Sequence, residues 1–269
     1  MREDKILKKL MREEYISDVK HRFLEKDKSL DASAFEEVFD KLTLFTIYEL
    51  MNKGIIDEFY GVVSAGKESR IYHAKSKNDE ELAVKIYLVN NAEFRKSRNM
   101  YVLNDPRFRR IPNQLRDFIY LWARREYSNL QSAYNSGIPV PRPITVSRNV
   151  LVMSFLGRNG ERYPLLREIE IDPDTGVIIY EKVVEYMEKL YRYAKLIHGD
   201  LSEYNIVFDY SDNVYFIDLS QAVHISHPMA IDLLRRDIKN VNRYFSSIGV
   251  ETLDDEALLS RIIQKEEEP

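Results

Sequence analysis

Cysteine is absent from this 269-residue sequence, and glycine and proline are scarce, with nine residues of each. Without cysteine the chain cannot hold a disulfide scaffold, a cysteine zinc site, an iron–sulfur cluster or a thiol nucleophile. The low glycine and proline content excludes collagen-like and low-complexity sequence. The chain is long enough to bury a sizeable core, either as one large domain or as two lobes around a cleft.

Long apolar runs are also missing. No stretch reaches the about 18 apolar residues that a membrane span requires, and residues 1–15 mix charged with apolar side chains, unlike a secretory signal. We therefore expect a soluble, cytoplasmic protein with no membrane partner. The net charge of −4 argues against a general coat for nucleic acid.

Positive charge is nevertheless concentrated in one stretch, where Asp105 is the single acid between Phe94 and Arg116. Residues 89–112 carry no clear helical or strand period, so we expect a basic loop there. Two interpretations stay open, a contact with RNA phosphates and a solvated charged loop. The basic residues in and beside this loop are Arg95, Lys96, Arg98, Arg107, Arg109, Arg110 and Arg116.

Hydrophobic spacing predicts the order of helices and strands. The first 50 or so residues are expected to be helical; one helix should begin at the capping-box pair Ser33 and Glu36, run to Leu50 and end at Gly54. The later expected elements are strands over 58–63, 70–75 and 81–88, a helix over 114–135, strands over 143–147 and 149–155, a helix over 175–197, strands over 205–208 and 214–217, and helices over 228–247 and 252–266. This order predicts an α+β protein with two lobes that meet at a connection near residues 153–157.

The densest group of polar residues is the segment HGDLSEYN, residues 198–205, followed by Asp218. Asp200 and Asn205 precede one strand of a predicted hairpin and Asp218 follows the other, so Asn205 and Asp218 should lie at the same end of the pair. One carboxylate with one or two further oxygens suits Mg²⁺, and Asp200 remains available to accept a proton from an incoming hydroxyl or to orient it. Each of these residues alone is typical of a turn. The three together at this spacing favour a catalytic site.

A second feature is the turn VSAGKESRI, residues 63–71, whose Gly66 would let phosphate oxygens approach backbone N–H groups. It lacks the leading glycine of a Walker A loop and alone would be an ordinary β-turn. Lys85 lies in an apolar strand, where its burial requires a partner. Glu126 in the helix over 114–135 is the candidate, in a pair that holds α- and β-phosphates.

The apolar strand LVMSFLG, residues 151–157, breaks at the expected connection between the lobes. Backbone groups of Ser154 and Leu156 are candidates to bind an adenine edge, with Met153 behind it. An ordinary core strand would have the same composition. A zinc site at His224 and His227 is disfavoured because no third strong ligand lies nearby.

The candidate features follow one another in the order found in the protein-kinase fold. That order is a phosphate-binding turn, a lysine in a strand, a glutamate in a helix, an apolar hinge, the segment His-Gly-Asp…Asn and finally Ile-Asp. Over about residues 40–250 the chain resembles the RIO family of atypical serine/threonine protein kinases, in particular its type-one branch. SAGKES replaces the glycine-rich loop, HGDLSEYN is the catalytic loop, and IDLSQ stands where ordinary kinases have Asp-Phe-Gly. The resemblance implies a two-lobed protein-kinase-like fold with a five-stranded antiparallel N-lobe plus one helix and a mainly helical C-lobe, without an activation segment or peptide-binding helices.

The same resemblance implies a helical extension over 1–57, an N-lobe over 58–153 and a C-lobe over 154–269. Asp200 would be the catalytic base, Asn205 and Asp218 the metal ligands, and Asp218 also a phosphate acceptor during ATP hydrolysis. The implied cofactors are ATP and Mg²⁺, with Mn²⁺ as a substitute. The implied nucleotide-binding residues are Val63, Ser64, Gly66, Lys67, Glu68, Ser69, Ile71, Lys85, Glu126, Met153, Ser154, Leu156 and Asn205.

The implied function is that of an Mg·ATP-dependent kinase with autophosphorylation and ATPase activity, acting in maturation of the small ribosomal subunit. Its partners would be proteins and RNA of the small-subunit precursor, with the basic loop against RNA, and the oligomeric state stays open. One alternative is an ATPase switch with little protein kinase activity, which the missing peptide-docking segment favours. A small-molecule kinase of the aminoglycoside or choline type would need more chain than Arg158–Asp174 offers after the hinge, and a pseudokinase conflicts with the complete set of catalytic positions.

Overall fold

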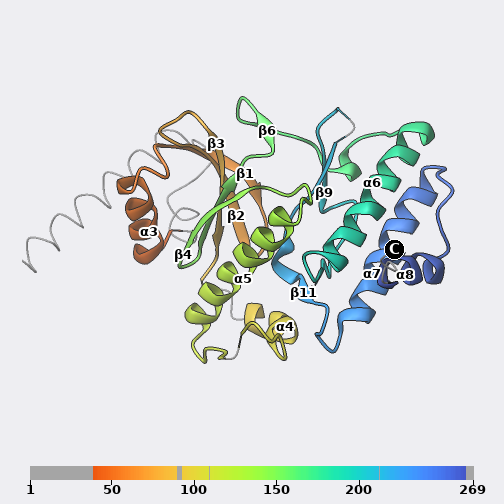
Figure 1. The fold of residues 1–269 in the computed structure, drawn as a ribbon. Coiled ribbons are helices and arrows are strands. Elements are labelled where there is room, and N and C mark those ends of the chain that lie inside the picture. The colour runs from red at the N-terminus through yellow and green to blue at the C-terminus, as the bar shows by residue number, and fades with distance from the viewer. Residues whose placement is uncertain (1–38, 90–92, 109, 212, 265–269) are drawn as a thin grey trace, which may run out of the picture. The chain divides into compact units, whose positions relative to one another are not determined.

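The computed structural model describes residues 39–89, 93–108, 110–211 and 213–264. Figure 1 shows the fold and the labels of its helices and strands. The chain divides into two compact units. The first unit takes the chain up to Phe94, together with Gln114–Arg124 and Ile144–Phe155; the second takes Arg95–Asn113, Arg125–Pro143 and the chain from Leu156 onward.

A five-stranded sheet dominates the first unit, in the order β1-β2-β3-β5-β4. Helix α3 (Lys41–Asn52) packs its buried residues Leu44, Ile47 and Leu50 into the same core as sheet residues such as Tyr72 and Val84. The short, β-branched and aromatic segments of the sequence account for these strands, and the expectation of five strands in this part of the fold is confirmed. The strands are β1 (Glu58–Ala65), β2 (Ser69–Lys75), β3 (Glu81–Tyr87), β4 (Pro143–Ser147) and β5 (Val150–Ser154).

The helix before the sheet begins later than the capping-box pattern predicts. Asp40 is the N-cap of α3, with extended backbone (ψ 163°), and its carboxylate accepts the N–H of Thr43 at 2.9 Å. A continuous helix from Ser33 to Leu50 is therefore wrong, because the chain is extended at Asp40; residues 1–38 lie outside the described residues. Gly54 ends the helix as expected, with a positive φ of 68° that an L-residue rarely adopts.

The basic stretch 89–112 contains a helix, α4 (Glu93–Val102), so the expectation of a loop there is wrong for these residues. The buried side chains of this helix are Phe94, Tyr101 and Val102, and most of its other residues are polar or charged. So few apolar residues give no recognisable helical spacing of hydrophobic positions in the sequence. Phe94 packs edge-on against Trp122, with ring centroids 5.8 Å apart. Trp122 lies on α5 (Leu115–Asn135), whose beginning and end belong to the first and second units respectively.

The second unit is mainly helical. Its long helices are α6 (Pro173–Arg192), α7 (Ala230–Ser247) and α8 (Asp255–Ile263), and Tyr180 of α6 donates a hydrogen bond to Asn242 of α7 at 2.9 Å. The short elements are β6 (Gly157–Arg158), β7 (Glu161–Arg162), the 3₁₀ turn η1 (Leu166–Glu168), β8 (Leu196–Ile197), β9 (Ile206–Phe208), β10 (Val214–Phe216), the 3₁₀ turn η2 (Leu219–Gln221) and β11 (Val223–His224).

The prediction of one helix over 175–197 is wrong at its end. Helix α6 stops at Arg192, Lys195 has a positive φ of 57°, and Leu196 and Ile197 form β8, which pairs with β11. The apolar spacing of the helix continues into these residues, but their burial comes from strand pairing with a segment distant in sequence. The polar segment 198–205 begins directly after β8.

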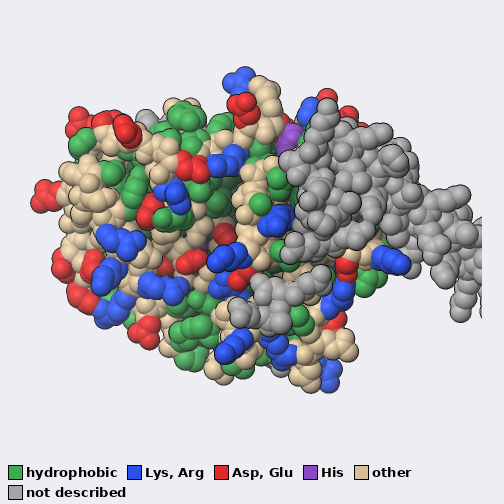
Figure 2. Space-filling model, turned by 180° about the vertical axis from the view of Figure 1, so that it is seen from behind, with side chains coloured by type: hydrophobic (Ala, Val, Ile, Leu, Met, Phe, Trp, Pro, Cys, Tyr) green, Lys and Arg blue, Asp and Glu red, His purple; other side chains and the backbone are tan. Residues whose placement is uncertain are grey.

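In the part of the chain that the structure describes, no helix combines the length and apolar character needed to cross a bilayer. Figure 2 shows one face of the molecule, on which Lys and Arg side chains alternate with Asp and Glu. On that face the charges do not gather into one patch of a single sign.

Candidate active site

Asn205 and Asp218 lie side by side at one end of a two-stranded hairpin. Strands β9 and β10 pair with Phe216 opposite Ile206, and the N–H of Ile217 donates to the carbonyl of Asn205 at 3.0 Å. Asp218 follows directly after Ile217. The register therefore confirms that Asn205 and Asp218 lie at the same end of the strand pair.

Asn205 has both a structural contact and an atom suited to a cation. Its Nδ2 donates to the backbone carbonyl of Asp200 at 2.8 Å, and its N–H donates to the carbonyl of Ser202 at 2.9 Å. These bonds close the loop, as expected of an asparagine in a turn. They use the donors of the residue, and the side-chain Oδ1 is the acceptor that can ligate a metal.

Asp218 is exposed and adopts a left-handed backbone (φ 56°, ψ 61°). It is the N-cap residue of η2, yet its side chain does not cap that turn. Such backbone costs a non-glycine residue about 1–3 kcal/mol and is concentrated at functional sites. One carboxylate beside one amide oxygen fits Mg²⁺, which keeps several waters; among the described residues no group of three His, Asp or Glu offers a denser metal site.

Helix α7 holds the backbone of the loop that carries Asp200. The two carboxylate oxygens of Asp237 accept the N–H groups of Gly199, at 2.7 Å, and Leu201, at 2.9 Å. The neighbouring Arg236 donates to the carbonyl of Gly199. Burial raises the pKa of Asp237 to about 7, although the N–H groups of Leu201 and Gly199 and the charge of Arg236 favour the carboxylate. Asp200 thus lies between two clamped backbone groups.

Asp237 was missed by the reasoning from sequence. A signal was present, because Asp237 lies on the buried face of α7 together with Leu233, Leu234, Ile238 and Val241. An acid within an apolar helix face must find donors in the fold. Its donors lie more than thirty residues away in the sequence, so spacing alone could not identify them.

His198 links the same loop to the end of β10. Its Nε2 donates to the carbonyl of Ile217 at 3.0 Å, and the side chain is 2 % exposed. Burial lowers the pKa of His198 to about 4. The ring is therefore neutral near pH 7 and fixes the distance between the Asp200 loop and the residue before Asp218.

The turn expected to bind phosphate lies between β1 and β2 of the first unit. Ser64, Gly66 and Lys67 are exposed, while Val63, Glu68, Ser69 and Ile71 are partly buried. The N–H of Gly66 donates to the carbonyl of Ser69 at 3.0 Å, so this particular donor already has a partner. Gly66 does not have a positive φ, and an added Cβ would meet only the Ser69 carbonyl oxygen, at an ordinary 3.5 Å. The fold itself does not require glycine at this position.

Lys85 and Glu126 are both buried, 4 % and 1 % exposed respectively. Lys85 lies on β3 opposite Ile71 of β2 and Leu151 of β5, and its Nζ lies 5.2 Å from the ring centroid of Tyr87. Glu126 belongs to the part of α5 in the second unit. The ion pair between Lys85 and Glu126 stays a prediction.

The expected adenine-binding strand is β5. Met153 and Ser154 lie opposite Ala83 and Leu82 of β3, with Met153 buried. The carbonyl of Leu156 accepts the N–H of Tyr163 at 3.0 Å, although a carbonyl oxygen can accept a second hydrogen bond. The adenine contact stays a prediction.

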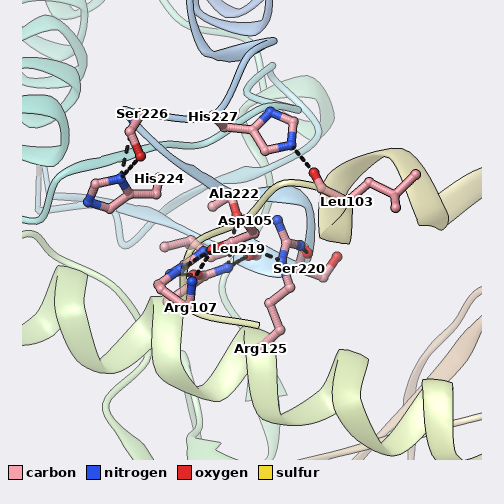
Figure 3. Close-up of polar contacts among 11 residues, drawn as sticks. Leu103, Asp105, Arg107, Arg125, Leu219, Ser220, Ala222, His224, Ser226 and His227 are labelled. Carbon is pink, nitrogen blue, oxygen red and sulfur yellow. Dashed lines mark hydrogen bonds and ion pairs between the residues drawn. The ribbon is translucent and has the colours of Figure 1, made fainter. Parts of the chain in front are cut away.

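The two histidines considered for zinc have other partners. His224 Nδ1 lies 2.7 Å from the hydroxyl of Ser226, and His227 Nε2 lies 2.8 Å from the carbonyl of Leu103. Figure 3 shows these side chains pointing to different partners. Each of these ring nitrogens thus has a polar partner within the second unit.

Comparisons with known proteins find matches that cover most of this chain. A family model described as the RIO domain matches residues 70–258. The RIO-type serine/threonine-protein kinase Rio1 of Haloferax volcanii is 42% identical over 229 residues, covering 84% of this chain and 77% of that protein. Serine/threonine-protein kinase RIO1 of Homo sapiens is 38% identical over 232 residues, covering 85% of this chain but only 40% of the human protein.

Among solved structures, the chain is similar to the Rio2 kinase of Chaetomium thermophilum in its ADP/Mg²⁺-phosphoaspartate complex. The TM-score is 0.65 at 23% identity, with 84% of this chain and 67% of that chain covered. This likeness confirms the two-lobed α+β kinase-like fold.

Proposed function

Because the chain belongs to the RIO family of serine/threonine kinases and is a phosphotransferase, we propose that it uses Mg·ATP, with Asp200 and Asp218 as its catalytic residues. The observation that carries this proposal is the arrangement of the hairpin end. It joins a carboxylate and an amide oxygen, Asp218 and Asn205, to a separate carboxylate, Asp200, on a loop whose backbone is clamped on both sides.

Each carboxylate has its own task in this proposal. Asp218 and Asn205 Oδ1 would hold Mg²⁺, which when bound neutralises charge on the phosphates. Asp200 orients a hydroxyl group and accepts its proton while the hydroxyl oxygen bonds to the γ-phosphorus. The bond from that phosphorus to the β–γ bridging oxygen breaks, and ADP leaves.

In the first unit, the turn over residues 64–69 and Lys85 are proposed to contact the phosphates, and the backbone near Ser154 is proposed to contact adenine. Leu156, the first residue of the following segment of the second unit, is proposed to contribute a further backbone contact to adenine. Support comes from the exposed turn with a glycine that the fold does not require, and from the burial of Lys85 in β3. A side chain at position 66 would occupy space that a phosphate group needs.

A second candidate activity is an ATPase switch. Only residues 225–229 separate β11 from α7, so the part of the chain after Asp218 leaves no room for a peptide-docking activation segment. In this reaction a carboxylate oxygen of Asp218 bonds to the γ-phosphorus, ADP leaves, and water then hydrolyses the acyl phosphate. We propose this reaction, with autophosphorylation, as an activity of the same site.

A time course with γ-³²P-ATP and Mg²⁺ distinguishes the two activities by following free phosphate and protein-bound label together. Acid-stable phosphoprotein that accumulates steadily indicates a working protein kinase. Free phosphate with substoichiometric, hydroxylamine-sensitive label indicates the ATPase switch. Asp200→Asn should lose the acid-stable phosphoprotein, and Asp218→Asn should lose both signals. Asp232→Asn, at an exposed acid on α7, should keep both. Absence of both signals in the wild type would contradict the proposal.

We also propose a cytoplasmic role in maturation of the small ribosomal subunit, with RNA contacted by the basic stretch. Arg107 is not available for such a contact, because its guanidinium binds Asp105 and Asn129 within the second unit. Lys96 and Arg110 are exposed and carry the charge that this proposal requires; Arg109 lies outside the described residues.

Precursor binding at several salt concentrations tests the RNA contact. The double variant Lys96→Gln, Arg110→Gln should bind more weakly and with a shallower salt dependence than the wild type, because fewer phosphates are neutralised. The double variant Lys239→Gln, Arg243→Gln, at two exposed positions of α7, is the matched control for loss of two charges. Unchanged affinity and salt dependence in the double variant would contradict the contact.

A further inference from the structure

We infer that Gln221 is a positioning residue for the carboxylate of Asp200, and that this contact makes the turn η2 a common support for both catalytic carboxylates. The side-chain Nε2 of Gln221 donates to Oδ2 of Asp200 at 2.8 Å. The inference rests on the proposed role of Asp200 as the base, but the contact itself can be measured separately.

The turn η2 is short enough to couple its two ends. Asp218 is its N-cap and Gln221 its last residue, so one 3₁₀ turn carries the proposed metal ligand and the group that holds the proposed base. The Asp200 loop also lies close to the turn. A Cβ added to Gly199, whose φ is 77°, would lie 3.0 Å from the carbonyl oxygen of Gln221.

Helix α5 fixes the backbone of this turn. Asn129 Nδ2 donates to the carbonyl of Leu219 at 2.7 Å and to that of Ala222 at 3.1 Å. Arg125 donates to the carbonyl of Ser220 and, at 2.6 Å, to that of Ala222. Figure 3 shows Arg125 rising from α5 toward this segment. Three carbonyls of the segment 219–222 are therefore held by two side chains that are themselves completely buried.

The charge of the buried Arg125 is balanced by Asp105. Asp105 Oδ2 lies 3.7 Å from Arg125 Nε and 2.7 Å from Arg107 Nη2, with the Asp105 and Arg125 side chains 0% exposed. Arg107 Nη1 in turn donates to Asn129 Oδ1 at 2.6 Å. The amide of Asn129 is thus fixed on both sides, which rigidifies its contact with η2.

A hydrogen bond from a neutral amide has two consequences for a carboxylate base. It restricts rotation of the carboxylate, and it favours the ionised form that accepts a proton. Removing the donor should therefore leave the Asp200 carboxylate less firmly oriented toward an incoming hydroxyl. This change acts on the transfer step and leaves the nucleotide contacts in place.

The variant Gln221→Met keeps the length of the side chain but removes the donor. We expect kcat to fall about 10-fold and the KM for ATP to stay unchanged. Gln221→Glu places a second carboxylate beside Asp200 and should lower kcat further while leaving the KM for ATP unchanged. Gln131→Met, an exposed glutamine of α5, is the matched control and should behave as the wild type.

A direct readout does not depend on activity. The side-chain amide resonances of Gln221 in the wild type should differ from those in Asp200→Asn, because the charged acceptor of the Nε2–H group is lost. If Asp200→Asn remains active while this difference is present, the contact stands and the role of Asp200 as the base fails. Identical Gln221 amide resonances in the two proteins, or a wild-type kcat in a folded Gln221→Met, would overturn the inference.

Discussion

The carboxylate of Asp237 accepts a hydrogen bond from the backbone N–H of Gly199 at 2.7 Å, across 38 positions of the sequence. The same carboxylate accepts the N–H of Leu201. Helix α7 therefore determines the path of the backbone on either side of Asp200, and the position of the proposed base depends on a residue that takes no part in the chemistry.

Asp237→Asn should lower both stability and turnover. The substitution keeps the size of the side chain but places an NH₂ group against one of the two backbone N–H donors, leaving that donor buried and unpaired. The loss should be about 2 kcal/mol in the free energy of unfolding, measured by urea denaturation, with a reduced kcat. Asp232→Asn, at an exposed position of the same helix, is the control. Equal stability of the two variants would contradict the role of Asp237.

The pH dependence of stability should report the buried His198. Its pKa in the folded protein is lowered to about 4 from 6.5, so the unfolded chain binds a proton that the folded protein does not. Stability from this group is fully present above pH 6.5 and is lost as the pH falls to 4, on the order of 3 kcal/mol in total. Asp237 acts in the opposite direction, because its folded pKa is raised to about 7.

His198→Gln keeps a donor for the carbonyl of Ile217 but removes the titration. Its free energy of unfolding should therefore decline less than that of the wild type between pH 6.5 and pH 4. Urea denaturation at several pH values measures the difference. Parallel curves for the two proteins would show that the histidine does not titrate between the folded and unfolded states.

The ion pair of the buried Asp105 with the partly exposed Arg107 should contribute more than a surface pair. Asp105→Asn leaves two arginines without their carboxylate and should cost about 3–5 kcal/mol. Asp79 forms an exposed ion pair with Lys75, and its side chain is 88% exposed. Asp79→Asn removes this pair and should cost less than about 1 kcal/mol in the free energy of unfolding. A double-mutant cycle with Arg107→Gln should show coupling of at least about 1 kcal/mol; additivity would contradict the network.

Two glycines should respond differently to alanine. Gly199→Ala forces a Cβ into a left-handed residue 3.0 Å from the Gln221 carbonyl oxygen, so it should lose about 1–3 kcal/mol of stability. Gly66→Ala has no such obstacle and should fold with unchanged or slightly higher stability, yet bind ATP more weakly. Thermal melting and calorimetric titration measure the two properties. Wild-type ATP affinity in Gly66→Ala would contradict the role of the turn.

Local patterns predicted most of the sheet and the hairpin that carries Asn205 and Asp218, because strand alternation and turn residues are properties of neighbouring positions. Helix α3 begins only at Lys41, because Asp40 with its extended backbone is the N-cap; the capping-box pair Ser33 and Glu36 lies outside the described residues. Helix α4 was missed because only a few of its residues are buried among many charges.

The contacts that hold the candidate site could not be predicted in this way. Gln221 reaches Asp200 across 21 positions, and Asn129 reaches Leu219 across 90. Both residues are ordinary polar residues in their own segments, and only the folded backbone brings them to their partners. Arg107 was expected to contact RNA, but its guanidinium binds the buried carboxylate of Asp105. In the sequence, Asp105 was visible only as a single acid within a basic stretch.

Nucleotide binding and turnover measured together test the central claim, which is the division of tasks between Asp218 and Asp200. Calorimetric titration of ATP with Mg²⁺ and with EDTA should show a Mg²⁺-dependent gain in affinity for the wild type and for Asp200→Asn, and little or none for Asp218→Asn. Both variants should lose phosphoryl transfer to a hydroxyl acceptor. A Mg²⁺-dependent gain that survives in Asp218→Asn, or transfer to a hydroxyl acceptor that survives in Asp200→Asn, would contradict the account.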